Sequence, residues 1–133
     1  MSVKIKAEYI GDDQVELTHT PSNTKIITDL PVDNGGRGRT FSPTDLVASA
    51  LSSCILTIMS KIAQKEGVDM KGTLIEIEKE MGANPRRISV LKGKITFPKG
   101  IPENKKEKLL SAIKSCPVTK SLHPDIKIEI TET

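Results

Sequence analysis

The stretch FSPTDLVASALSSCILTIMSKIAQKEG, residues 41–67, constrains the fold most, because it predicts one long apolar helix. Ser42 suits the N-cap, Pro43 the first helical position, and Asp45 supplies the acid of a capping box. Gly67 is the stop signal. Apolar residues between these limits recur at three- and four-residue steps: Leu46, Val47, Ala50, Leu51, Cys54, Ile55, Leu56, Ile58, Met59 and Ile62. We therefore expect a central helix with most of its circumference buried.

Alternating polar and apolar residues predict strands on both sides of this helix. The expected strands cover residues 3–10, 14–17, 25–28, 73–80, 88–97 and 126–130. Pro102 opens a second helix over residues 103–115, and residues 117–122 add a helical turn. The order β-β-β-α-β-β-α-β predicts an α+β fold in one domain, residues 1–133. Because the first helix is apolar on more sides than one small sheet can cover, we expect a homodimer.

Charge and composition argue against two classes of partner. The net charge is +3, the lysines are scattered among glutamates, and the chain has no Trp, one Tyr and two Phe. A nucleic-acid footprint and stacking platforms for bases are therefore not expected. The N-terminal residues lack the apolar core of a signal peptide, and we expect the apolar runs to be too short to cross a bilayer. These features predict a cytoplasmic protein without a membrane partner.

The two cysteines are the residues of this sequence most able to take part in a reaction. Cys54 lies in the middle of the long helix, and Cys116 precedes Pro117 at a helix boundary. A reducing cytosol disfavours a permanent disulfide, which leaves a metal site, a redox pair or inert burial as a small hydrophobe. A zinc site would also need His19 and His123, but no pair among the four residues has the short spacing of structural zinc motifs. We expect no metal and no cofactor.

The segments SPTDLVASALSSC and SCPVTKSL resemble the two cysteine motifs of the OsmC/Ohr family, the osmotically inducible and organic-hydroperoxide-resistance proteins. The order of strands and helices is also similar. The resemblance implies an intertwined homodimer, with two central helices wrapped by antiparallel sheets, that reduces organic hydroperoxides. By position, Cys54 would be the peroxidatic thiol and Cys116 the resolving thiol, and an external dithiol would reduce the resulting disulfide.

A reactive thiol at Cys54 needs help to ionise. Its position in mid-helix brings no benefit from the helix dipole, and burial raises a thiol pKa unless a cation lies close by. The family resemblance implies an arginine held by a carboxylate. Arg37 and Arg39, in the glycine-rich loop before the helix, are the preferred candidates because this loop leads into the reactive helix; Arg86 and Arg87 are the alternatives.

The chain departs from the family pattern at Thr44, where the well-characterised peroxidases of the family carry a glutamate. The nearest acid is Asp45, which has an equally good explanation as the capping acid. Cys54 follows Asp45 by nine residues, so the two side chains lie about 13 Å apart along the axis and on opposite faces. If both belong to one site, an arginine must bridge them or the acid must come from the partner helix.

Two functions follow from these residues. In the first, an apolar entrance lined by Phe41, Leu51, Ile55 and Ile58 favours alkyl hydroperoxides over hydrogen peroxide, and a helix N-terminus at Cys116 makes its sulfur a good leaving group. In the second, a non-enzymatic member of the same fold binds a small apolar ligand in the interface cavity. Both cysteines are then packing residues, an alternative that Thr44 keeps open.

Overall fold

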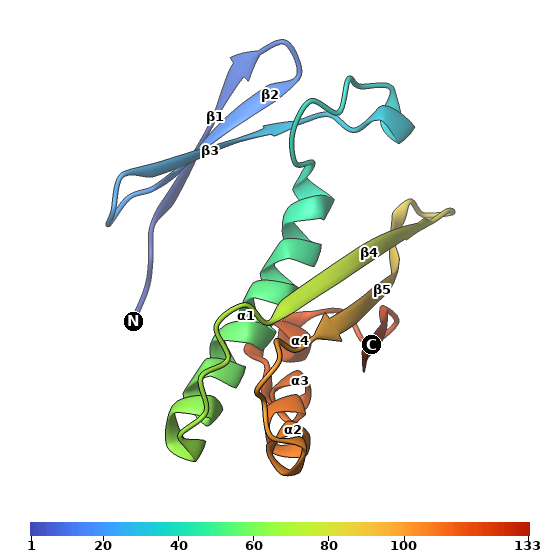
Figure 1. Cartoon of the computed structure of the whole chain (residues 1–133). Coiled ribbons are helices and arrows are strands. Elements are labelled where there is room, and N and C mark those ends of the chain that lie inside the picture. Colours follow the sequence, from blue (N-terminus) through green and yellow to red (C-terminus); the bar gives the residue numbers. More distant parts are fainter. The chain divides into compact units, whose positions relative to one another are not determined.

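The computed structural model describes all 133 residues and has the α+β element order that the sequence predicts (Figure 1). The chain forms two compact units, residues 1–46 and 47–133, and each is described by itself. The assignment of the whole chain to one domain stays a prediction.

The first unit is built on a three-stranded antiparallel sheet. Its strands are β1 (Ile5–Gly11), β2 (Gln14–His19) and β3 (Thr24–Asp29), in the order β1-β2-β3. Asp12 and Asp13 both have positive φ, as a tight hairpin between β1 and β2 requires. All three strands lie where the alternating pattern predicts them, extended by one to two residues at most ends.

The two faces of this sheet differ sharply in polarity. Residues directly opposite each other share a face, so Leu17 lies between Ala7 and Ile26, whereas Glu16 lies between Glu8 and Ile27. Continuing the alternation assigns six apolar residues to the first face: Ile5, Ala7, Tyr9, Val15, Leu17 and Ile26. The other face carries mainly charged and hydroxyl side chains.

The glycine-rich segment after β3 has a defined shape. It contains a 3-10 turn, η1 (Val32–Asn34), and returns so that the Gly38 N–H donates to the Leu30 carbonyl at 3.0 Å. Gly36 lies so close to Leu30 that a Cβ there would overlap the Leu30 carbonyl, and Gly38 has a φ of +56°. Only glycine suits these two positions, because one lacks space and the other needs a left-handed backbone.

Helix α1 (Pro43–Glu66) begins and ends where the sequence predicts. The Ser42 N–H donates to Asp45 Oδ2 at 2.9 Å, and the Asp45 N–H donates to Ser42 Oγ at 3.0 Å, so the capping box is confirmed. Gly67 follows the helix with a φ of +66°. An 18-residue stretch of α1 has a mean hydropathy of 1.7, so by length and composition alone this helix could cross a membrane, although core helices of soluble proteins pass the same test. The expectation that every apolar run is too short is wrong for this helix.

Burial along α1 is narrower than expected. The fully buried positions form one stripe: Ala48, Leu51, Ile55, Met59 and Ala63. Cys54 and Ile58 are only partly buried, and Ala50 is exposed. The prediction that most of the circumference is buried is therefore wrong for a single chain, because one small layer of strands and helices covers only one side of the helix.

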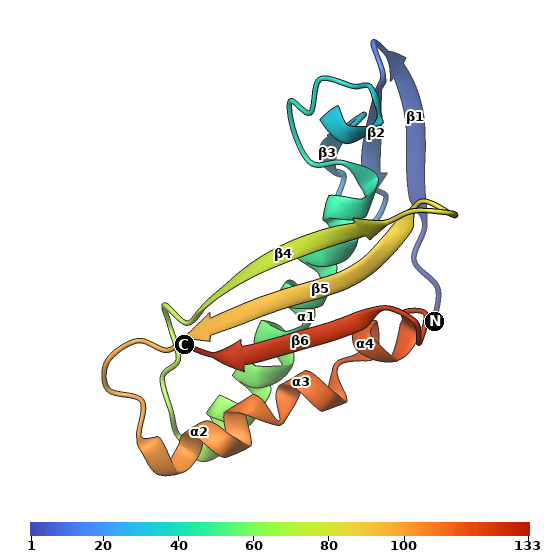
Figure 2. The same ribbon diagram turned by 90° about the vertical axis from the view of Figure 1, so that its right-hand side faces the viewer.

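The second unit pairs a sheet with helices on one of its faces (Figure 2). Strands β4 (Leu74–Gly82), β5 (Arg87–Thr96) and β6 (Lys127–Glu132) form the sheet. Helices α2 (Glu103–Leu110), α3 (Ala112–Ser115) and α4 (Pro117–Ser121) connect β5 to β6. The one predicted helix over residues 103–115 is thus interrupted at Ser111.

The β5–β6 pairing corrects the expected strand direction. β4 and β5 are antiparallel, but β6 runs parallel to β5. The physical reason is the connection: a run of helices carries the chain back along the sheet before β6 begins, as a parallel pair requires. The expectation of purely antiparallel sheets was therefore wrong for this edge.

The apolar core of the second unit lies between its helices and the inner face of the sheet. Its most completely buried large side chains are Leu51, Ile55, Met59, Leu91, Ile95, Leu109 and Cys116. At the rim of the core, Glu66 accepts from Lys105 at 3.1 Å and from Lys108 at 3.2 Å, which ties the end of α1 to α2. This packing fixes α1 against the segment that carries Cys116.

Candidate functional site: a pair of thiols

The structure brings the two cysteines together inside the second unit. Cys54 lies in the middle of α1 and Cys116 at the N-cap of α4, and their thiols are within hydrogen-bonding reach of each other. Both are free thiols; Cys116 is 0% exposed and Cys54 is partly exposed. Two side chains from distant parts of the sequence therefore form one site, with only Cys54 reaching the surface.

Local backbone geometry explains why Cys116 sits at this position. Pro117 occupies the first turn of α4, and Cys116 before it has an extended backbone, as proline imposes on its predecessor. The backbone N–H groups of Val118 and Thr119, in the first turn of α4, face the Cys116 sulfur and favour its anion. Burial opposes ionisation, but the Cys54 thiol and these donors outweigh it and hold the pKa of Cys116 below its ordinary value.

The pKa of Cys54 shifts in the opposite direction to that of Cys116. Burial raises the pKa of the Cys54 thiol, and the hydrogen bond to Cys116 raises it further, while the Val118 N–H offsets part of the effect. In the second unit the thiolate of the pair therefore forms on Cys116. The expectation that burial raises the pKa of a mid-helix thiol is confirmed, because the amides of the helix are already used by the helix and cannot reach the sulfur. The lowering of this pKa by an arginine stays a prediction.

Arg39, in the first unit, is held firmly by a buried carboxylate. Its Nε donates to Asp29 Oδ2 at 2.7 Å, its Nη2 to Asp29 Oδ1 at 3.1 Å, and its backbone N–H to Asp29 Oδ2 at 2.9 Å. Arg39 Nη1 also reaches Asp12 at 2.7 Å. These donors lower the pKa of Asp29 to about 2, and the two carboxylates raise the pKa of Arg39. Such a forked pair fixes a guanidinium in one orientation.

Arg37 is held much more loosely than Arg39. Its side chain is 68% exposed and its single ion pair, to Asp12, measures 3.4 Å. The two loop arginines, equivalent by sequence, are therefore separated by the structure, and Arg39 is the ordered one. Of the alternatives, Arg87 donates to the Ile88 carbonyl next to it in β5.

Asp29 is the residue that the sequence interpretation missed. It is 1% exposed at the end of β3, two residues after the apolar pair Ile26-Ile27. A carboxylate that ends an apolar strand must be paired when buried, and arginines follow ten residues or fewer downstream. A carboxylate at the end of an apolar strand, followed by arginines, was the sequence signal that could have identified Asp29. Asp45, the acid chosen from the sequence, is confirmed as the capping acid.

The expected apolar entrance is divided between core and surface. Leu51 and Ile55 are completely buried in the core of the second unit, Ile58 is partly buried against it, and Phe41 of the first unit is 53% exposed. His19 and His123 are exposed and bonded locally, to Ser22 and to the Asp125 N–H. No group of three or more His, Cys, Asp or Glu side chains gathers as a metal site would require.

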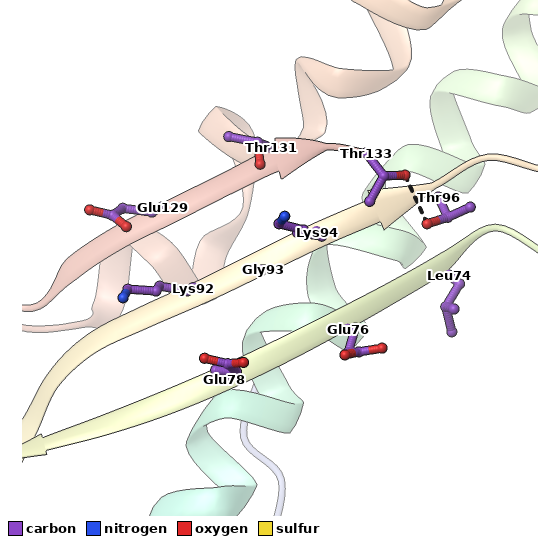
Figure 3. A pocket seen from close by; sticks show the side chains of 10 residues that line it. All are labelled: Leu74, Glu76, Glu78, Lys92, Gly93, Lys94, Thr96, Glu129, Thr131 and Thr133. Carbon is purple, nitrogen blue, oxygen red and sulfur yellow. Dashed lines mark hydrogen bonds between the residues drawn. The ribbon is translucent and has the colours of Figure 1, made fainter.

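A groove of the second unit lies away from the thiols. It occupies about 420 Å³ over the outer face of the sheet, where Lys92 and Lys94 alternate with Glu76, Glu78 and Glu129 (Figure 3). The helices and the cysteines are on the other face, with the core. We regard this groove as a solvated sheet surface.

The α+β fold brings together two free thiols, one from a long helix and one from the start of a short helix. This arrangement is that of a dithiol protein. The chain belongs to the OsmC-like protein family, whose model matches residues 35–131. This confirms the family resemblance stated from the two cysteine motifs.

Solved structures support the same assignment. A candidate osmotic stress induced and detoxification response protein from Psychrobacter arcticus 273-4 is 42% identical, with a TM-score of 0.91, over 97% of this chain and 94% of that one. An organic hydroperoxide resistance protein OsmC from Legionella pneumophila is 18% identical, with a TM-score of 0.80, over 100% and 97%.

A third structure, an organic hydroperoxide resistance protein from Elizabethkingia anophelis, is 14% identical, with a TM-score of 0.77, over 100% and 96% of the two chains. The last two likenesses show the fold alone. A comparison with curated proteins found no match.

Proposed function

We propose that this protein is a thiol-dependent peroxidase that reduces organic hydroperoxides with Cys54 and Cys116. The observation that carries the proposal is the contact between the two thiols, one partly exposed and one buried. Relatives of the same fold from Legionella and Elizabethkingia are named for organic hydroperoxide resistance. A partly exposed thiol beside a buried one is the arrangement that an attacking and a resolving sulfur need.

The reaction balances with these two sulfurs and an external dithiol. The Cys54 thiolate attacks the terminal peroxide oxygen, the O–O bond breaks, and the alkoxide leaves and takes up a proton to become an alcohol. Cys54 is now a sulfenic acid. The Cys116 sulfur attacks it, water leaves, and a disulfide forms. A dithiol from outside then reduces this disulfide through a mixed disulfide.

The proton on Cys54 has an acceptor close at hand. Because the pKa of Cys116 is lowered and that of Cys54 is raised, the first proton that the pair loses comes from Cys116, and the Cys54 thiol then donates to the Cys116 thiolate. We propose that Cys116 takes this proton as Cys54 attacks. Proton transfer within the pair supplies a nucleophile at a position where the helix itself offers no help.

Arg39 is the arginine that we assign to this reaction, in preference to Arg37. Its support is the forked ion pair with Asp29, which keeps the guanidinium ordered and charged. The family resemblance implies an arginine held by a carboxylate, and Asp29 fits that part better than Asp45, which caps α1. A positive group of this kind would lower the pKa of Cys54 and favour the thiolate.

The proposed assembly is a homodimer in the cytoplasm, without nucleic-acid or membrane partners. Its support is the exposed apolar face of the β1–β3 sheet and the narrow buried stripe of α1, both of which leave apolar side chains uncovered in one chain. A second copy would offer the same α1 surface as a cover.

The direct test is consumption of an alkyl hydroperoxide with a dithiol reductant. The wild-type protein should turn over, Cys54→Ser should lose turnover, and Cys116→Ser, which lacks both the resolving sulfur and the proton acceptor, should turn over much more slowly. Mass spectrometry of the wild type after one equivalent should show a Cys54–Cys116 disulfide. Full activity in Cys54→Ser would contradict the mechanism.

A second function, binding of a small apolar ligand without catalysis, is favoured by one observation. Burial raises the pKa of Cys54, as expected for a packing residue. The same oxidation experiment separates the two functions, because a binding module would leave both thiols reduced when one equivalent of alkyl hydroperoxide is added.

A further inference from the structure

We propose that Thr119 is a positioning residue that donates its hydroxyl to the Cys116 thiolate and so selects Cys116 as the leaving sulfur when the disulfide is reduced. The proposal deepens the proposed function, on which it rests for the existence of the disulfide. Nothing in the sequence motif alone distinguishes Thr119 from an ordinary helix residue.

The first observation is an unused hydroxyl. Thr119 Oγ1 is buried and has no hydrogen-bond partner. A threonine in the first turns of a helix ordinarily donates to a carbonyl three or four residues back, and several serines of this chain do so. An orphaned buried hydroxyl costs free energy unless another state of the protein supplies its partner.

The second observation is its neighbour. Both the backbone N–H and the side chain of Thr119 act on the Cys116 sulfur and favour its anion. A neutral thiol accepts a hydrogen bond weakly, so a protonated Cys116 gives the Thr119 hydroxyl little reason to bond, whereas a thiolate accepts strongly. A small rotation of the Thr119 side chain about its Cα–Cβ bond can bring the hydroxyl into line with the sulfur, so Thr119 gains a partner when Cys116 is ionised.

The third observation is the difference in access between the sulfurs. Cys54 is partly exposed and Cys116 is 0% exposed, so an external dithiolate reaches Cys54 first. Its sulfur bonds to Cys54, the Cys54–Cys116 bond breaks, and the electron pair goes to Cys116. The second sulfur of the reductant then releases Cys54 and leaves the reductant as a disulfide. Stabilising the Cys116 thiolate therefore assists the first of these steps.

Other groups that act on Cys116 come from two elements. Cys54 on α1 is the titratable group that faces it, and the N–H groups of Val118 and Thr119 belong to α4 itself. Replacing the hydroxyl of Thr119 leaves all of these donors in place. The substitution thus isolates one hydrogen bond.

The test compares Thr119→Val, which removes the hydroxyl at nearly constant shape, with Thr119→Ser, which keeps it. The disulfide is made with diamide, so the measurement does not need peroxidase activity. In Thr119→Val the equilibrium constant for reduction by dithiothreitol should fall about tenfold, the expected loss of one hydrogen bond to a charged group. The thiolate ultraviolet absorbance of Cys116 should also titrate at higher pH, and Thr119→Ser should restore both.

Unchanged values in Thr119→Val would overturn the proposal, as would a loss that Thr119→Ser shares in full. If Thr119→Val fails to fold, Thr119→Ala replaces it and must give the same shift. A shift in a protein that consumes no hydroperoxide would overturn the proposed function while leaving Thr119 as the donor to Cys116.

Discussion

The two units of this chain differ in what they bury. Every buried apolar side chain belongs to residues 47–133, whereas the buried side chains of residues 1–46 are Thr28, Asp29 and Ser42, all polar. The first unit also carries all but one of the exposed large apolar side chains. One unit therefore has a hydrophobic core of its own, and the other is organised by hydrogen bonds and ion pairs.

Because of this difference, the candidate functional residues of the two units are held in place in two different ways. The thiol pair is positioned by core packing, because α1 and the segment carrying Cys116 share one apolar cluster. The Arg39–Asp29 pair is positioned by a loop that depends on two glycines and on charge. A three-stranded sheet with one apolar face is marginal until that face is covered, so the arginine is the more vulnerable element.

The largest expected effect comes from breaking the core of the second unit. Leu91→Ala removes a completely buried side chain between the sheet and the helices. We expect the free energy of unfolding to fall by about 2–5 kcal/mol, measured by urea denaturation. Leu74→Ala is the matched control, because Leu74 is 56% exposed on the neighbouring strand and should cost about 0.5 kcal/mol or less. Equal losses would contradict the assignment of the core.

The next effect tests the uncovered face of the first unit. Ile26→Lys places a charge on the apolar face of the β1–β3 sheet, which the proposed second copy covers. We expect about 2 kcal/mol weaker dimerisation, from lost burial of one isoleucine, measured by light scattering across protein concentrations. Ile27→Lys, one residue on and facing Glu16, is the control. A dimer that tolerates both equally would show that this face is not covered.

A smaller effect tests the ion pair through pH. Because the folded pKa of Asp29 is about 2 and its unfolded pKa is near 4, its contribution is complete above pH 4 and lost as pH falls toward 2. In Asp29→Asn the free energy of unfolding should vary less over this window than in the wild type. The measurement is denaturation at a series of pH values. Parallel curves would show that the pair does not stabilise the fold.

The smallest effect concerns the start of α1. Ser42→Ala removes the acceptor of the Asp45 N–H and should cost about 1 kcal/mol of stability in thermal or urea unfolding. Ser42→Thr keeps the acceptor and should cost less. If both variants lose the same amount, the capping bond is not what Ser42 contributes.

Much of the fold could be predicted because it depends on local patterns. The capping box and Gly67 set the limits of α1, and alternation located all six strands. The direction of β6 could not be read this way, because alternation is the same for parallel and antiparallel strands. The interruption at Ser111 could not be predicted either, because the helical pattern is continuous through this residue.

For the site, the sequence by itself determined which sulfurs are available and that arginines lie near a glycine loop. Only the tertiary structure decided that the thiols meet, that Cys116 carries the lowered pKa, and that Asp29 holds Arg39. The physical reason is that local backbone preferences act over a few residues, whereas the pKa of a buried thiol and the partner of a buried carboxylate depend on atoms that packing brings from elsewhere.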